Sequence, residues 1–279
     1  MPKIVLRDYQ KDAVRFTEKV DKSLLCMRVG SGKTICAMFS LRNFFKKNLV
    51  DKAIVACTKS SVAVFKEDFK EKAGLKINLV EDPYRLLEFF DSKEKVCIVK
   101  HSMFEKAGND VYILKKLEEV AKKMKVALVI DEAHKLQNPD GIAHEAYHHM
   151  SFLFNRVILL TATPYSSCLS QFYGLIHLVY PKLWKSKREF FNRYIDEVTI
   201  LSPVTHRPVR KEKVRYKNLK EFRSLIEPFT YFYYPAVPLV HKEHHTRLDD
   251  YSEYDNLCKG ILSEIEKEKL AKLEIIRDE

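Results

Sequence analysis

The chain has 279 residues, of which 46% are hydrophobic and 31% are charged. This composition is typical of a globular protein with one large domain or two small ones, and it excludes an intrinsically disordered chain. The 49 Lys and Arg residues outnumber the 38 Asp and Glu residues, and the resulting net charge of +11 favours a polyanionic partner. No apolar run approaches the length of about 18 residues that a membrane-spanning helix needs, and the charged N-terminus is not a signal peptide.

The six cysteines form no Cys-x-x-Cys pair, and most of them lie in apolar runs. This placement is typical of buried free thiols rather than of a disulfide framework or a zinc site. We therefore expect a protein that is not secreted and that resides in the reducing cytoplasm.

Short apolar runs alternate with amphipathic stretches along the first 180 residues. The runs are rich in Val, Ile and Leu without a clean polar–apolar alternation, which is typical of parallel strands buried on both faces. In chain order the predicted elements are strand Leu24–Val29, helix Thr34–Phe45, strand Ala53–Cys57, helix Val62–Lys72, helix Pro83–Phe90, strand Val96–Val99, helix Val111–Lys123, strand Val126–Ile130, helix Ile142–Phe152 and strand Val157–Leu160. This order predicts an α/β fold with a parallel sheet flanked by helices.

The pattern changes after Pro164, where the strand–helix alternation stops. The basic, proline-punctuated stretch 198–217 predicts either a hairpin or a loop. We expect a boundary near residue 182, with a mainly helical, basic appendage over residues 183–279. The predicted helices of this appendage and the segment before it are Leu169–Tyr180, Lys187–Tyr194, Leu219–Ile226 and Glu253–Ile276.

A glycine-rich segment, Gly30–Thr34 with the sequence GSGKT, follows the first predicted strand and opens the first predicted helix. Glycines let successive backbone N–H groups point at phosphate oxygens, and the helix N-terminus adds the positive end of its dipole. Lys33 is placed to reach the β- and γ-phosphates, and the Thr34 hydroxyl is a ligand for Mg²⁺. Met27 stands where the general P-loop has its first glycine, so the match is partial. The strand–turn–helix context favours a nucleotide site over a chance glycine turn.

Two acidic residues, Asp131 and Glu132, follow directly on the predicted strand Val126–Ile130. The carboxyl ends of parallel strands face the crevice in which ligands bind. We therefore expect Asp131 to hold Mg²⁺ and Glu132 to polarise the water that attacks the γ-phosphate, the alternative being an acidic surface loop.

The segment Thr161–Pro164, with the sequence TATP, follows the last predicted strand. Its hydroxyls are placed to bond the acidic motif and to relay the state of the nucleotide to neighbouring surfaces. The alternative is a capping and turn segment before the next helix.

Taken in order, LRDYQ at Leu6–Gln10, GSGKT, DEAH and TATP resemble the motifs of superfamily-two helicase-like motors. Several stretches resemble the Swi/Snf-type ATPases in particular: 131–139, 161–181, 190–194, and 216–219 with 226–229. The resemblance covers about residues 4–260. It implies that residues 1–182 are a RecA-like ATP-binding lobe, and that residues 183–279 lead toward a second RecA-like lobe that is absent from the chain.

The resemblance also implies roles for the residues that match its motifs. The implied nucleotide-binding residues are Arg7, Gln10, Gly30, Ser31, Gly32, Lys33 and Thr34, the implied metal ligands are Thr34 and Asp131, and the implied catalytic residues are Lys33, Asp131 and Glu132. The residues implied to couple the ATP state to movement are His134, Thr161 and Thr163. Those implied to contact the nucleic-acid backbone, in the segments 58–61 and 100–102, are Lys59, Ser60, Lys100, His101 and Ser102.

The chain departs from the Swi/Snf pattern at three places. Met27 and Arg28 stand where relatives usually carry acidic residues. The segment Thr230–Pro235 reads TYFYYP where relatives usually carry paired arginines. No segment matches the arginine-finger motif of the second lobe, and the chain ends where a linker to that lobe would begin.

We therefore expect the N-terminal lobe of an ATP-dependent DNA translocase that binds Mg²⁺ and ATP, acts on duplex rather than single-stranded DNA, and hydrolyses ATP poorly without its second lobe. The alternatives are a fragment of a DEAH-type unwinding helicase, a single-lobe regulator that binds nucleotide or nucleic acid, and a P-loop enzyme such as a small-molecule kinase. The lysine-rich, glycine-poor composition is also typical of a compact viral or phage enzyme.

Three further groups of residues each have two interpretations, one functional and one purely structural. The basic stretch 207–217 is either a phosphate-tracking arm or a solvated loop, with the loop favoured. Two histidine clusters lack the spacing of a metal site, which favours surface or packing roles: His144, His148 and His149, and His241, His244 and His245. The aromatic run 229–234 favours packing over base stacking.

Overall fold

The structure is a computed structural model of the 279-residue chain, and it describes residues 5–69, 74, 76–164, 169–201 and 208–234. The predicted helix Glu253–Ile276 and the histidines of the second cluster lie outside the described residues. The chain divides into one unit that spans Met1–Pro235 and a second that spans Ala236–Glu279. Every helix and strand of the described structure belongs to the first unit.

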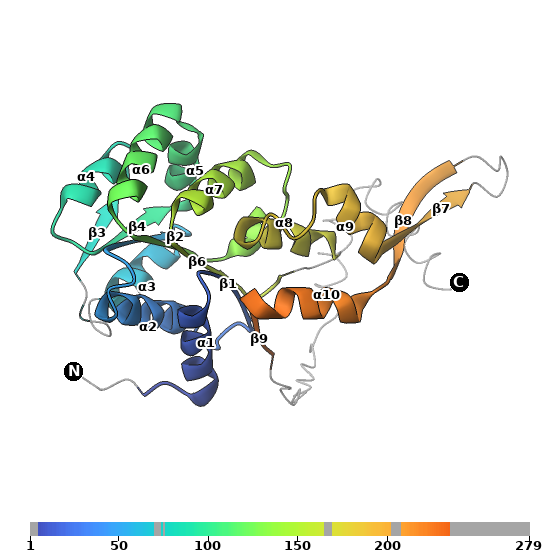
Figure 1. Cartoon of the computed structure of the whole chain (residues 1–279), viewed down its shortest axis with the longest axis horizontal. Coiled ribbons are helices and arrows are strands. Elements are labelled where there is room, and N and C mark those ends of the chain that lie inside the picture. Colours follow the sequence, from blue (N-terminus) through green and yellow to red (C-terminus); the bar gives the residue numbers. More distant parts are fainter. Residues whose placement is uncertain (1–4, 70–73, 75, 165–168, 202–207, 235–279) are drawn as a thin grey trace, which may run out of the picture. The chain divides into compact units, whose positions relative to one another are not determined.

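A seven-stranded parallel sheet forms the centre of this unit (Figure 1). Its strands are β1 (Lys22–Met27), β2 (Lys52–Cys57), β3 (Ile77–Val80), β4 (Val96–Lys100), β5 (Val126–Ile130), β6 (Arg156–Thr161) and β9 (Thr230–Tyr233). They pair in the order β3-β4-β2-β5-β6-β1-β9, and every neighbouring pair is parallel. All five predicted strands are present, and the predicted parallel α/β fold is confirmed.

The sequence pattern misses β3 and β9, the two edge strands of the sheet. An edge strand has a neighbour on one side only, so it needs less apolar sequence than an inner strand. Val80 is the buried residue of β3, and Thr230 is the buried residue of β9. Neither strand therefore carries the continuous apolar run by which the inner strands are identified.

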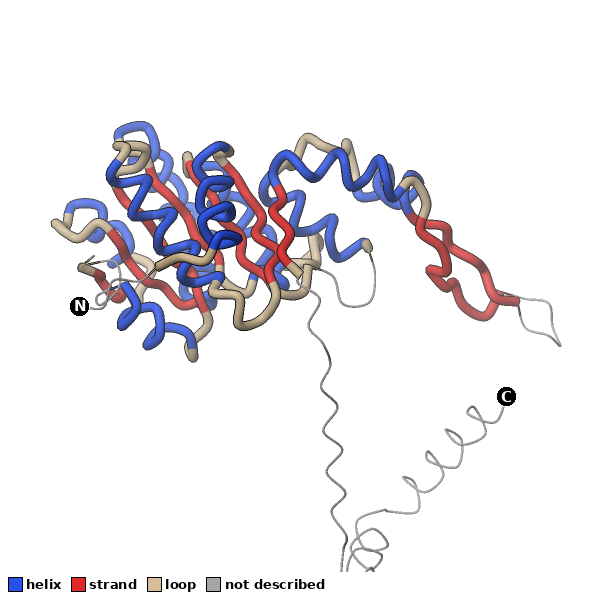
Figure 2. The backbone as a smooth tube through the Cα atoms, turned by 90° about the horizontal axis from the view of Figure 1, so that it is seen from below, coloured by secondary structure: helices blue, strands red, loops and turns tan. Residues whose placement is uncertain are grey.

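Helices cover both faces of the sheet (Figure 2). One face packs against α1 (Asp8–Lys19), α2 (Lys33–Lys46) and α3 (Ser61–Asp68). The other face packs against α4 (Arg85–Asp91), α5 (His101–Asn109), α6 (Val111–Lys123), α7 (Ile142–Leu153) and α8 (Ser170–Val179). Of these eight helices, α1 and α5 are absent from the sequence-based prediction, and the other six are confirmed.

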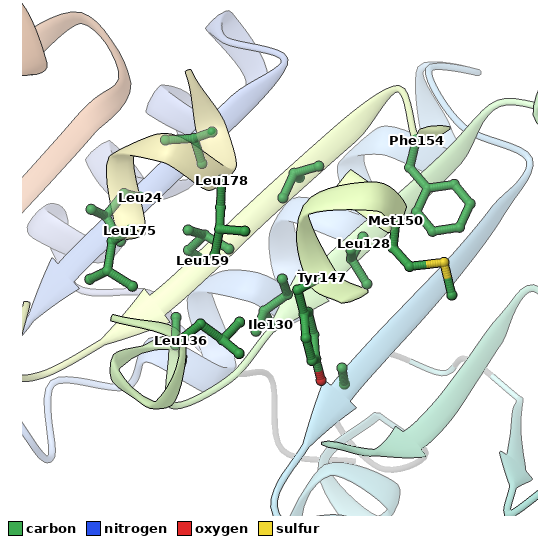
Figure 3. Close-up of a cluster of buried hydrophobic side chains, with 14 of the residues drawn as sticks. Leu24, Leu128, Ile130, Leu136, Tyr147, Met150, Phe154, Leu159, Leu175 and Leu178 are labelled. Carbon is green, nitrogen blue, oxygen red and sulfur yellow. The ribbon is translucent and has the colours of Figure 1, made fainter. Parts of the chain in front are cut away.

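Each face of the sheet carries its own cluster of buried side chains. Successive strand residues alternate between the clusters: Leu24 packs toward α8, and Leu25 packs toward α1 and α2. Figure 3 shows part of the first cluster, in which Tyr147 and Met150 of α7 lie against Leu128 and Ile130 of β5. Full burial of such a side chain contributes about 1.5–3 kcal/mol to stability. Because the inner strands contribute side chains to both clusters, successive residues of these strands are all apolar.

Beyond α8 the chain leaves the sheet and then returns to it. The elements are α9 (Lys187–Tyr194), the antiparallel hairpin of β7 (Ile195–Leu201) and β8 (Pro208–Tyr216), α10 (Leu219–Ile226), a short 3₁₀ helix (Glu227–Phe229) and β9. The basic stretch 198–217, for which hairpin and loop are the alternatives, forms a hairpin. The predicted boundary near residue 182 stays a prediction, and Phe190 and Phe222 beyond it join the same buried cluster as α8.

The sequence predicts no membrane-spanning helix, and it predicts buried free cysteines. Among the described residues, no helix combines the length and the apolar character required to cross a membrane. Cys26, Cys36, Cys57 and Cys97 are free thiols in the protein interior, and burial raises the pKa of Cys36 and Cys57 to about 12. Such thiols are protonated and unreactive at neutral pH.

A buried lysine closes the C-terminal end of α4. The Nζ atom of Lys52 donates hydrogen bonds to the carbonyl oxygens of Phe89 at 3.2 Å, Ser92 at 2.6 Å and Glu94 at 2.8 Å. Burial lowers the pKa of Lys52. Because a cation is favourable at a helix C-terminus, the three carbonyls form a specific site for this ammonium group.

Replacing Lys52 with methionine is expected to lower the free energy of unfolding by about 2 kcal/mol, since it leaves three carbonyls without their donor. Urea unfolding monitored by circular dichroism measures the loss. Lys95→Met is the matched control, because Lys95 is exposed and lies 5.5 Å from the ring centroid of Phe45. Equal losses for the two variants would contradict a specific role for Lys52.

Three histidines stack where α7 and α8 meet. The ring centroids of His148 and His177 lie 4.5 Å apart at an interplanar angle of 7°, and His144 lies 5.5 Å from His177. The Nε2 atom of His144 bonds the carbonyl oxygen of Gly174 at 3.0 Å. Within the described residues no group of histidine, cysteine or acidic side chains is arranged to hold a metal ion. The cluster therefore packs helices together.

This cluster is expected to make the fold less stable in acid. Burial lowers the pKa of His148 to about 4, with His177, His144, His149 and Lys22 adding repulsion. The unfolded chain binds the proton near the ordinary value of about 6.5, so stability is complete above pH 6.5 and falls as the pH drops toward 4. Urea unfolding at several pH values measures this slope. His148→Gln is expected to flatten it, whereas a slope unchanged from the wild type would contradict the assignment.

Candidate nucleotide site

The phosphate loop connects β1 to α2. Gly30 and Gly32 have φ angles of 76° and 83°, a left-handed conformation that glycine adopts without steric cost. The Oγ atom of Ser31, between them, donates to the carbonyl oxygen of Arg28 at 2.6 Å. Helix α2 begins at Lys33 with Gly32 as its N-cap, and its first turn carries no acidic residue. The loop therefore offers backbone N–H groups and a helix N-terminus to an anion, without a competing carboxylate in that turn.

The first turn of α1 lies against this loop. The Oε1 atom of Gln10 accepts a hydrogen bond from the backbone N–H of Arg7 at 2.9 Å. The Nε2 atom of Gln10 donates to the carbonyl oxygen of Ser31 at 2.9 Å, and the Tyr9 hydroxyl donates to the same oxygen at 3.1 Å. A Cβ atom added at Gly32 would lie 2.5 Å from Gln10 Nε2. The structure thus brings the predicted residues Arg7 and Gln10 to the predicted phosphate loop.

The acidic motif follows β5 at the carboxyl edge of the sheet. The backbone N–H of Asp131 donates to the carbonyl oxygen of Ala56 in β2 at 2.9 Å, and the residue is 6% exposed. Burial raises the pKa of the Asp131 carboxyl and Glu132 adds to this effect, whereas Lys33 and a hydrogen bond from Ser61 oppose it. The charged carboxylate therefore lies in a site where a further cation would stabilise it.

These groups fit the preference of Mg²⁺ for oxygen ligands. The carboxylate of Asp131 and the hydroxyl of the half-buried Thr34 are both hard oxygen donors. The positive charge of Lys33 lowers the pKa of Asp131. The end of the phosphate loop therefore influences the charge of the acidic motif. Asp131 and Thr34 are therefore the residues that would hold the ion.

Glu132 has a backbone conformation that is rare for a residue with a side chain. Its φ and ψ angles are 48° and 46°, in the left-handed region, and such strain is concentrated at functional sites. One carboxylate oxygen of Glu132 lies 3.1 Å from the Nδ1 atom of His134, although the two atoms are not aligned for a hydrogen bond. The strained turn directs the side chains of Asp131 and Glu132 differently, so that one is buried and the other half-exposed.

His101 points inward, toward the acidic motif. Its Nε2 atom lies 2.9 Å from the carbonyl oxygen of Asp131, and its Nδ1 atom lies 2.5 Å from the Tyr147 hydroxyl. Because a carbonyl oxygen only accepts, Nε2 carries the proton and Nδ1 accepts from Tyr147. Burial lowers the pKa of His101 to about 4, which keeps the ring neutral. The side chain predicted to contact nucleic acid is thus engaged with protein atoms on both nitrogens.

The other predicted nucleic-acid contacts gather at the same edge of the sheet, at the ends of β2 and β4. Lys59, Ser60 and Ser102 are exposed. Lys100 forms an ion pair with Glu81 at 2.6 Å. Exposed hydroxyls and cations at strand ends are the groups that contact phosphate.

Hydroxyl groups connect this edge to the acidic motif. The Thr58 hydroxyl lies 2.8 Å from the Ser61 hydroxyl, and the Ser61 side chain lowers the pKa of the Asp131 carboxyl. Among the residues individually assigned roles from the sequence, neither Ser61 nor Tyr147 appears. Ser61 lies in the segment 58–61 that the resemblance identifies, so the motif contained that signal, whereas nothing near Tyr147 in the chain points to His101.

The threonine motif is joined to the extension of the acidic motif. The Oγ1 atom of Thr161 accepts from the backbone N–H of Thr163 at 3.1 Å. The Nε2 atom of Gln137 donates to the carbonyl oxygens of Thr163 at 2.9 Å and Pro164 at 2.8 Å. Gln137, which has no role in the sequence-based prediction, therefore joins the extension of the acidic motif to the predicted coupling residue Thr163.

Comparison with known proteins supports this assembly of motifs. A family model described as SNF2-related domain matches residues 9–231. A mouse chromodomain-helicase-DNA-binding protein 1-like is 25% identical over 241 residues, which cover 81% of this chain and 24% of that protein. A zebrafish DNA repair and recombination protein RAD54-like is 27% identical over 217 residues, which cover 71% of this chain and 29% of that protein. The chain thus spans about a quarter of the length of such relatives.

The fold has solved counterparts. The Sulfolobus solfataricus SWI2/SNF2 ATPase core in complex with dsDNA superposes with a TM-score of 0.62 at 20% sequence identity. The superposition covers 82% of this chain and 44% of that one. The core domain of the same ATPase gives a TM-score of 0.58.

Proposed function

Because the chain belongs to the SNF2-related domain family, we propose that it is the N-terminal RecA-like lobe of an ATP-dependent duplex-DNA translocase. In this proposal residues 1–182 bind ATP, and residues 183–279 lead toward a second RecA-like lobe. The chain covers 44% of the solved ATPase core it matches, which supports a one-lobe assignment. The protein acts where its DNA is, in the cytoplasm, nucleoid or nucleus.

One observation carries the proposal more than any other. The backbone carbonyl of the buried Asp131 bonds the ring of His101 at 2.9 Å, and His101 belongs to the segment 100–102 that the resemblance assigns to nucleic-acid contact. A small-molecule kinase has no need for such a connection. A motor does, because its hydrolysis must respond to the polymer that it moves along.

Each residue of the site has a chemical task in this proposal. The loop 30–34 binds the phosphates through its backbone N–H groups, and Lys33 neutralises the charge of the γ-phosphate. Mg²⁺, when bound by Thr34 and Asp131, shields the phosphates and aligns the γ-phosphate for in-line attack. Glu132 orients the attacking water and accepts its proton. Gln10 has the role of reading the adenine edge through its second amide proton and second lone pair, since Oε1 already accepts from Arg7 and Nε2 already donates to Ser31.

The 279-residue chain is expected to bind Mg-ATP weakly and to hydrolyse it poorly. An arginine finger supplied by a partner domain contributes about 10³–10⁵ in rate in related NTPases, and the second lobe would supply that group. Robust DNA-stimulated turnover by this chain would contradict the one-lobe assignment.

Two titrations test the proposal. Calorimetry measures the affinity for Mg-ATP, and fluorescence anisotropy measures the affinity for a labelled duplex between about 50 and about 200 mM salt. We expect duplex affinity to fall steeply with salt, because each neutralised phosphate releases a counterion. Lys59→Ala is expected to reduce the slope of log K against log salt by about 0.9, whereas Lys123→Ala, at the C-terminal end of α6, is the matched control.

The outcomes separate the alternatives. Duplex binding without nucleotide binding indicates a single-lobe regulator. Nucleotide binding with no salt-dependent DNA binding indicates a small-molecule enzyme. Strand separation by a chain that includes the second lobe indicates an unwinding helicase.

A further inference from the structure

The proposed function gives no task to the aromatic segment Tyr231–Tyr234. Its strand, β9, lies beside β1 at the edge of the sheet (Figure 1). The two strands are parallel, with Leu24 opposite Thr230 and Met27 opposite Tyr233. The segment therefore ends beside the phosphate loop, which begins where β1 ends.

Tyr233 and Tyr231 both contact Tyr9 at the start of α1. The rings of Tyr233 and Tyr9 are stacked, with centroids 3.8 Å apart and an interplanar angle of 9°. The Tyr231 hydroxyl donates to the backbone carbonyl of Tyr9 at 2.8 Å. Burial raises the pKa of Tyr231 to about 12, so this hydroxyl remains a donor throughout the neutral range. Ring and backbone of Tyr9 are thus fixed by two different residues of one strand.

Tyr9 in turn contacts the phosphate loop. Its hydroxyl donates to the Ser31 carbonyl, which also accepts from Gln10 Nε2. Ser31 lies between two glycines in left-handed conformations, and glycine loses more conformational freedom on ordering than any other residue. A second contact reaches the loop directly, because the backbone N–H of Arg28 donates to the carbonyl of Tyr233 at 3.0 Å.

We propose that Tyr231 and Tyr233 are positioning residues for nucleotide binding, which hold Tyr9 against the Ser31 carbonyl and so keep the phosphate loop in its binding conformation. This inference rests on the proposed function only for the identity of the ligand. The contacts themselves predict that the loop is more ordered with the ring stack than without it.

The same segment also reaches the threonine motif. The Tyr234 hydroxyl donates to the carbonyl oxygen of Ala162, the second residue of that motif, at 2.7 Å. Tyr231, Tyr233 and Tyr234 thus contact α1, the phosphate loop and the loop after β6.

The test compares two substitutions at one position. Tyr233→Leu removes the ring stack and keeps an apolar side chain, whereas Tyr233→Phe keeps the ring. We expect Tyr233→Leu to weaken Mg-ATP binding about three- to tenfold, as loss of an aromatic pair typically does, and Tyr233→Phe to match the wild type. Calorimetry with Mg-ATP measures both. Single-turnover hydrolysis at saturating Mg-ATP is expected to be unchanged, because the defect lies in binding rather than in the chemical step.

Hydrogen exchange without nucleotide provides a readout that is independent of the ligand. In Tyr233→Leu the amides of residues 28–33 are expected to exchange faster, while those of β5 exchange at the wild-type rate. If the wild-type chain binds no Mg-ATP, the proposed function fails, yet faster exchange at the loop still supports the positioning role. Wild-type exchange at the loop in a folded Tyr233→Leu variant would overturn the inference. Equal loss of affinity in Tyr233→Leu and Tyr233→Phe would overturn it as well, because it would show that the ring stack is not the cause.

Discussion

Replacing Glu132 with glutamine is expected to lower the rate of ATP hydrolysis about 10²–10⁴-fold, the contribution typical of a positioned general base. Glutamine keeps the length and shape of the side chain, so it preserves the strained turn in which Glu132 has a φ angle of 48°. Its amide does not accept the proton of the attacking water. Affinity for Mg-ATP is expected to be unchanged, because Asp131 and Lys33 remain.

Single-turnover hydrolysis with saturating duplex DNA is the appropriate measurement, since it detects slow chemistry without repeated cycles. Glu118→Gln is the matched control, because Glu118 is an exposed carboxylate on α6. A Glu132→Gln variant with wild-type turnover would show that another group accepts the proton. Equal losses for both variants would show that the effect is not specific to the site.

Replacing Gly174 with alanine is expected to destabilise the fold by about 3 kcal/mol, the upper part of the usual range for overpacking. In the middle of a helix alanine normally stabilises relative to glycine by about 1 kcal/mol, so the expected sign is reversed. The reason is a backbone contact: a Cβ atom at Gly174 would lie 2.2 Å from the carbonyl oxygen of Gln137 and 2.7 Å from its carbonyl carbon. Backbone atoms of a packed segment have little freedom to move away.

The same substitution is expected to disturb the link between the acidic and threonine motifs, because Gln137 makes that link through its side chain. Thermal and urea unfolding measure the stability. Gly141→Ala is the control, since the atom nearest to its Cβ would be the Asn138 carbonyl oxygen at 3.3 Å, followed by the Asn138 side chain at 3.5 Å. A Gly174→Ala variant as stable as the wild type would show that the segment after β5 shifts without cost.

The inner part of the fold follows directly from local sequence. The strand Val126–Ile130 and the helices Val111–Lys123, Lys187–Tyr194 and Leu219–Ile226 have the same bounds in the sequence-based prediction and in the structure. An inner strand is buried on both faces and therefore shows an unbroken apolar run. A helix with one apolar stripe shows its period in the chain.

The missed elements lack these signals. Helix α1 buries Gln10, Ala13, Val14 and Thr17, and apart from Tyr9 and Phe16 the rest of its sequence is charged. Helix α5 contains Gly108, which is unfavourable in a helix by local propensity but lies where a Cβ would be 2.7 Å from the Ala146 carbonyl oxygen. In both helices tertiary packing rather than propensity decides the structure.

Some residues of the candidate site could be predicted from the sequence, and others could not. The residues of the phosphate loop and the acidic motif could be assigned from the sequence because their neighbours in the chain define them: a buried strand, a turn and a helix. The contacts of His101 could not be predicted in this way. Its motif predicts a nucleic-acid contact, yet the ring bonds the Asp131 carbonyl and the Tyr147 hydroxyl. Only the order of β4, β2 and β5 in the sheet brings these three residues together.

The sequence by itself determined the fold class, the family resemblance and the order of the motifs, because each depends on residues within a short span of chain. The tertiary structure alone decided how those motifs are connected. Tyr231 and Tyr233 follow Tyr9 by more than 200 positions, and they contact it because β9 pairs with β1. Long-range pairing of this kind depends on which strand edges remain free once the inner sheet has formed, and no local pattern in the chain records that.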